Sequence, residues 1–182
     1  MAEEAQLQEL PTGLRPKTGG WFVVNVRDAW WLQNDKFGHS CTFEGEWPDA
    51  WFSGLGIKVN VLQPGQPNCL YHRENLQEGF LVLHGECLLI VDGQERPLRA
   101  WDFVHCPPET DHVFVGAGEG PCAILMVGVR SEDEELHYPV SEVAARYGAS
   151  VDTATSSPDE AYATTPKWDL GRPGSPDELP WA

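Results

Sequence analysis

Two histidines and two glutamates in the middle of the chain have the types and the spacing of metal ligands. His72 and Glu74 are two residues apart, so in a strand their side chains project to the same side. Glu78 lies just before the apolar run 80–83, and His112 opens a later run of the same kind. An ionised carboxylate in an apolar interior is unfavourable unless it is paired or binds a metal. The four residues therefore indicate a site at which a metal ion could act.

The elements that must position these residues are short strands divided by turn signals such as Asp92-Gly93. Strand-like runs occupy residues 57–62, 80–84, 87–91, 101–106, 112–115 and 123–127. This close spacing is typical of an all-β sandwich or barrel. We therefore predict an all-β fold with a single jelly-roll β-barrel over about residues 55–130.

The stretch 65–112 resembles two sequence motifs of the cupin family. The first motif has a glycine, a His-x-His pair, a glutamate a few residues later, and another glycine after six further residues. The matching residues in this chain are Gly65, His72-Arg73-Glu74, Glu78 and Gly85. The second motif, Pro-x-Gly followed after two residues by histidine, is similar to residues 107–112. Glu74 stands where the family usually has its second histidine. The resemblance implies a single-domain cupin barrel.

The resemblance also implies a metal centre with His72, Glu78 and His112 as ligands. Glu74 is then either a fourth ligand or an acid/base residue. Two neutral imidazoles and two carboxylates balance a divalent charge, and the oxygen donors favour Fe(II), Mn(II), Ni(II) or Zn(II) over Cu(I). The alternative is a relic site in which Glu78 is satisfied by Arg73 or by hydrogen bonds.

Two classes of function follow from such a centre. One is a metal-dependent enzyme of dioxygenase, isomerase or lyase type that acts on a small oxygen-bearing organic molecule, with Glu74 as the catalytic proton-transfer residue. The other is a module that binds or senses a small molecule without turnover. Because one fold hosts many functions, both classes stay open.

The chain on either side of the barrel divides into three extensions. Residues 1–20 end in a run of breakers and are expected to be a flexible arm. Residues 21–54 are rich in tryptophan and are expected to pack on the barrel, beginning with a strand over 21–26. Residues 131–182 form an acidic, mostly irregular C-terminal extension with a short helix over 141–148, between a serine cap and a glycine stop.

The composition of the chain limits the classes of binding partner and the cellular compartments that can be expected. The 182 residues include 12 basic and 28 acidic ones, giving a formal net charge of −16, which disfavours nucleic acid and anionic membranes. We expect a cytoplasmic protein, because no signal peptide or transmembrane window is evident, and reduced thiols, because the five cysteines form no CxxC pair. The runs 80–83 and 122–127 are apolar on both faces, which indicates a covered sheet or a dimer interface, and we expect a homodimer.

Overall fold

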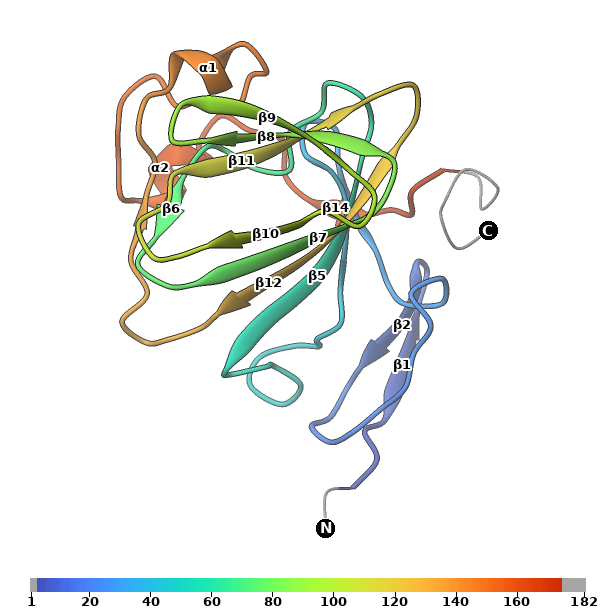
Figure 1. Ribbon diagram of the computed structural model, residues 1–182. Coiled ribbons are helices and arrows are strands. Elements are labelled where there is room, and N and C mark those ends of the chain that lie inside the picture. Colours follow the sequence, from blue (N-terminus) through green and yellow to red (C-terminus); the bar gives the residue numbers. More distant parts are fainter. Residues whose placement is uncertain (1–2, 175–182) are drawn as a thin grey trace.

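The computed structural model describes residues 3–174, and two antiparallel sheets that pack face to face dominate it (Figure 1). The larger sheet has seven strands in the order β10 (Phe103–Cys106), β7 (Glu78–His84), β12 (Cys122–Val129), β5 (Leu55–Leu62), β4 (Gly38–Thr42), β3 (Leu32–Asn34) and β14 (Asp169–Leu170). The smaller sheet has the order β11 (His112–Ala117), β8 (Glu86–Val91) and β9 (Gln94–Arg99). The predicted jelly-roll fold is confirmed, with two sheets that do not close into one continuous barrel.

The core between the two sheets consists of apolar side chains at alternate positions of the strands. On β7, Phe80 and Val82 face inward, and on the neighbouring β12 so do Ile124 and Met126. Phe114 of β11 meets them from the smaller sheet, with its ring centroid 4.7 Å from that of Phe80. Successive side chains of a strand point to opposite faces, so the residues between these four lie on the outer face of the larger sheet.

The outer face of the larger sheet is covered by the extension that precedes the barrel. Trp31, which is 1% exposed, packs there with Val59 and Val61 of β5 and with Ala123 of β12. Of the two structures expected for runs that are apolar on both faces, the covered sheet is therefore present here. Trp47, in contrast, is 76% exposed.

The amino-terminal segment differs from the flexible arm predicted for residues 1–20. It forms a hairpin of β1 (Leu7–Leu10) and β2 (Gly13–Pro16). Isolated bridges join Glu4 to Trp21 and Leu14 to Ala29, so the following segment supplies the hydrogen-bond partners that local sequence does not.

The strand predicted over residues 21–26 is also wrong. Asn25 forms a turn in which its carbonyl accepts hydrogen bonds from the amides of Asp28 and Ala29, while its side-chain oxygen accepts one from the Arg27 amide. Such a turn at asparagine competes with extended backbone.

The carboxyl-terminal extension is more ordered than predicted through residue 174. The helix α1 (Glu142–Ala145) begins after Ser141, whose hydroxyl accepts from the Ala144 amide, as the serine cap predicted. A second helix, α2 (Pro158–Ala161), follows; β13 (Leu136–His137) pairs with β6 (Arg73–Glu74), and β14 pairs with β3. Residues 175–182 of the predicted extension lie outside the described residues. No helix in the described part of the chain is long and apolar enough to span a membrane.

Candidate metal centre

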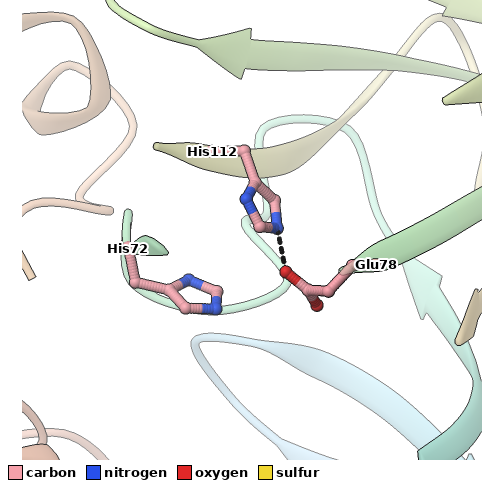
Figure 2. A group of neighbouring side chains, drawn as sticks. All are labelled: His72, Glu78 and His112. Carbon is pink, nitrogen blue, oxygen red and sulfur yellow. Dashed lines mark ion pairs between the residues drawn. The ribbon is translucent and has the colours of Figure 1, made fainter. Parts of the chain in front are cut away.

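Three of the four predicted site residues converge between the two sheets (Figure 2). Glu78 is the first residue of β7 and His112 the first of β11, while His72 precedes β6 and forms a backbone bridge with His112. One ligand atom from each of the three lies within 4.8 Å of those from the other two. The site is sheltered, since the side chain of His112 is 2% exposed and that of Glu78 is 13% exposed.

Both histidines are held by the backbone so that the same ring nitrogen faces the site. The Nδ1 of His72 lies 2.9 Å from the carbonyl oxygen of Leu70, and the Nδ1 of His112 lies 3.0 Å from that of Thr110. A carbonyl can only accept, so each Nδ1 carries a proton, and each Nε2 presents a lone pair whenever its imidazole is neutral. A hydrogen bond of this kind fixes the tautomer and the orientation of metal-binding histidines.

The separation between the donor atoms of His112 and Glu78 fits a shared cation. The Nε2 of His112 lies 3.2 Å from Oε2 of Glu78, and ligand atoms about 2.1 Å from one metal ion lie roughly 3 to 3.5 Å apart. Two acceptors at this distance repel each other unless a proton or a cation lies between them. Arg73, the predicted alternative partner of Glu78, instead pairs with Glu109 at 3.0 Å and with Asp111 at 3.1 Å.

The pKa values show how the site is arranged without a metal. Burial, and then the charge of Glu74, raise the pKa of Glu78 to about 7, whereas burial, and then His72, lower the pKa of His112 to about 4. A proton shared by the Glu78–His112 pair therefore resides on the carboxyl group, which donates to the histidine. Burial opposes protonation of His72, but Cys69, Glu74 and Glu78 together raise its pKa well above the usual value.

Glu74, the predicted fourth ligand or acid/base, lies beside this group of three. Its Oε1 is 3.7 Å from Nε2 of His72, and its side chain is 15% exposed. The carboxylate thus borders the same pocket without joining the three converging ligand atoms. This position suits a residue that transfers protons to or from a molecule bound next to His72.

The three residues lie at the wall of a pocket of about 510 Å³. Its aromatic lining comes from both extensions as well as the sheets and consists of Trp30, Trp51, Phe80, Tyr138 and Tyr162. Its further charged lining consists of Glu44, Lys58, Arg130 and Glu134. The volume is that of a site for a small organic molecule.

The carboxyl-terminal extension contributes directly to the site, which sequence reasoning missed. The ring of Tyr138 stacks on His72 with centroids 5.8 Å apart. The hydroxyl of Tyr162 accepts a hydrogen bond of 3.1 Å from the Leu70 amide, and the carbonyl of Leu70 holds Nδ1 of His72. Tyrosine in an acidic, proline-rich tail carries no local signal of such a role.

Comparison with known proteins identifies the family. Residues 59–128 match the family model of the cupin domain. Together with the jelly-roll fold, this match identifies residues 59–128 as a cupin domain. A search of curated proteins found no match.

Solved structures that are similar to this chain come from several bacteria. A polyketide cyclase from Streptomyces resistomycificus is 16% identical, with a TM-score of 0.52 over 61% of this chain and 80% of its own. A sugar phosphate isomerase from Silicibacter pomeroyi is 23% identical, with a TM-score of 0.46 over 70% of this chain and 75% of its own. A protein proposed to be a sugar phosphate isomerase, from Acidithiobacillus ferrooxidans, is 25% identical, with a TM-score of 0.44 over 46% of this chain. The chain spans 55% of the length of that last protein.

Proposed function

We propose that this cupin binds one divalent transition metal through His72, Glu78 and His112 and acts on a small oxygen-bearing organic molecule in the adjoining pocket. The observation that carries the proposal is the orientation of the two imidazoles. A backbone carbonyl holds each Nδ1, which leaves Nε2 of His112 3.2 Å from the Glu78 carboxylate and Nε2 of His72 3.7 Å from the Glu74 carboxylate. Two nitrogens and a carboxylate oxygen suit Fe(II), Mn(II), Ni(II) or Zn(II).

The metal, when bound, would act as a Lewis acid that polarises an oxygen of the substrate. The chain itself provides the other functions. The aromatic side chains of the pocket exclude water around the bound molecule, and the Tyr138 ring keeps His72 in place by stacking. Glu74, which faces the same space, moves a proton to or from the substrate.

Calorimetric titration of the metal-free protein with Zn(II) tests the ligand assignment. His112→Ala and Glu78→Gln should each weaken binding by at least a hundredfold, because either change removes one of three ligands. His84→Ala, which alters an exposed histidine at the end of β7, should bind as the unchanged chain does. Equal loss in His84→Ala, or tight binding by His112→Ala, would contradict the assignment.

Glu74→Gln separates the two roles of that residue. As a proton-transfer residue, Glu74 can be replaced with little change in Zn(II) affinity, while turnover of a substrate is lost. A hundredfold loss of Zn(II) affinity would instead make it the fourth ligand. If the metal-loaded chain binds small molecules and converts none, the sensing module is the correct class.

A further inference from the structure

The pocket next to the metal centre contains two basic side chains with opposite surroundings. The guanidinium of Arg130 donates to both carboxylate oxygens of Glu44, at 2.6 Å and 2.7 Å, and to the carbonyl of Phe52 at 2.9 Å. It also lies 3.7 Å from the ring centroid of Trp51. Lys58, in contrast, makes no side-chain hydrogen bond or ion pair with any residue between 3 and 174. Lys58 is therefore the basic group that remains available to a ligand.

The strand register places Lys58, an exposed residue of β5, on the face of the larger sheet that lines the pocket. Lys58 of β5 is paired with Met126 of β12, which is paired in turn with Phe80 of β7. Directly paired residues lie on one face of a sheet, and Met126 and Phe80 belong to the core between the sheets. The ammonium group is close enough to Glu78 and His112 that its charge lowers the pKa of both.

We propose that Lys58 binds the carboxylate of a small organic acid, with a second oxygen function of the same molecule directed at the His72–Glu78–His112 centre. This inference rests on the proposed function, because the centre must hold its metal for the second oxygen to bind there. A lysine ammonium is a compact point charge with three donors, and a carboxylate of one negative charge matches it.

The other charges of the pocket favour a carboxylate over a phosphate. Glu74 and Glu134 line the same space, and neither forms an ion pair with a basic residue of the described chain other than a histidine. A dianionic phosphate would place a second negative charge near them, with only one lysine to offset it. Without the divalent cation these carboxylates outnumber Lys58, so the acid should bind only to the metal-loaded protein.

Calorimetry on the Zn(II)-loaded chain tests the proposal with three acids of increasing length: glycolate, 3-hydroxybutyrate and 4-hydroxybutyrate. Each is compared with its neutral amide. At least one acid should bind, and its amide should bind at least tenfold more weakly. Protein from which a chelator has removed the metal should bind neither. Lys58→Met should weaken acid binding tenfold or more, and Lys58→Arg should restore part of it. Lys17→Met, at an exposed lysine of the amino-terminal segment, is the matched control.

The same samples show whether a failure concerns Lys58 or the metal centre. Zn(II) affinity of Lys58→Met should equal or exceed that of the unchanged chain, because a positive charge near the cation is removed. If the unchanged chain binds no Zn(II), the proposed function itself fails. If it binds Zn(II) but no acid, or acid and amide equally, or if Lys58→Met binds the acid normally, the role of Lys58 is overturned. Inorganic phosphate binding more tightly than every acid would overturn the choice of a carboxylate.

Discussion

Replacing Arg130 with methionine should destabilise the protein and open one wall of the pocket. The change leaves the carboxylate of Glu44 without its partner, although the side chain of Glu44 is only 6% exposed. Breaking a buried ion pair from one side lowers the free energy of unfolding by about 3 to 5 kcal/mol. Arg130 is itself 23% exposed, so we expect the lower end, about 3 kcal/mol.

For a chain of this size, 1 kcal/mol corresponds to roughly 2 to 4 °C in melting temperature, so the expected decrease is about 6 to 12 °C. Thermal unfolding followed by circular dichroism measures it. The control is Arg146→Met, because Arg146 pairs with Glu95 at 3.3 Å on the surface and is 59% exposed, and such pairs contribute about 1 kcal/mol or less. Adding Glu44→Gln to the Arg130 variant should recover part of the stability. A decrease no larger than that of Arg146→Met would refute the reasoning.

Three further predictions concern the site and the assembly. Zn(II) affinity should fall by at least about fivefold from pH 7 to pH 6, because the cation must displace the proton that Glu78 retains below its pKa of about 7 and the proton that the raised pKa of His72 favours. A flat profile in a pH-dependent titration would contradict this. Tyr162→Phe removes the hydroxyl that holds the Leu70 amide and should weaken Zn(II) binding several-fold. Tyr147→Phe, which removes an exposed hydroxyl bonded to Glu95, should leave Zn(II) binding unchanged. Equal Zn(II) affinities of the two variants would exclude a role of Tyr162 in positioning His72. Light scattering at micromolar concentration should give the mass of a homodimer, and a monomer mass would refute that prediction.

The strands in the central part of the fold could be predicted because their signals are local. Strand alternation and turn residues indicate the strands between 55 and 130 directly. The grouping of His72, Glu78 and His112 is implied by the resemblance to the cupin motifs. The structure places two of them at the start of a strand and bridges the third to one of these strands.

The face of β5 could not be predicted from its own sequence. Val59 and Val61 alternate with Lys58 and Asn60, a pattern that ordinarily sends the valines to the core and the lysine to solvent. Here the valines meet Trp31 of the preceding extension, which covers the outer face. Lys58 lies on the opposite face, where it stays exposed and lines the pocket.

The structure of the two extensions could not be predicted, because it depends on contacts with residues far away in the sequence. The amino-terminal hairpin is held by bridges to residues beyond it, and Tyr162 reaches Leu70 across 92 positions of the sequence. Tertiary contacts of this kind leave no periodicity in the segment itself, so a composition rich in proline, glycine and acid indicated disorder instead.

X-ray absorption at the zinc edge of the Zn(II)-loaded chain tests the central claim most directly. With His72, Glu78 and His112 as ligands, the spectrum should show two imidazoles and further nitrogen or oxygen donors at about 2.0 to 2.2 Å, with no sulfur. Cys69, whose sulfur lies 3.7 Å from Nδ1 of His72, is the nearby thiol that could compete. A sulfur donor at about 2.3 Å, or a spectrum without imidazole scattering, would contradict the proposed metal centre.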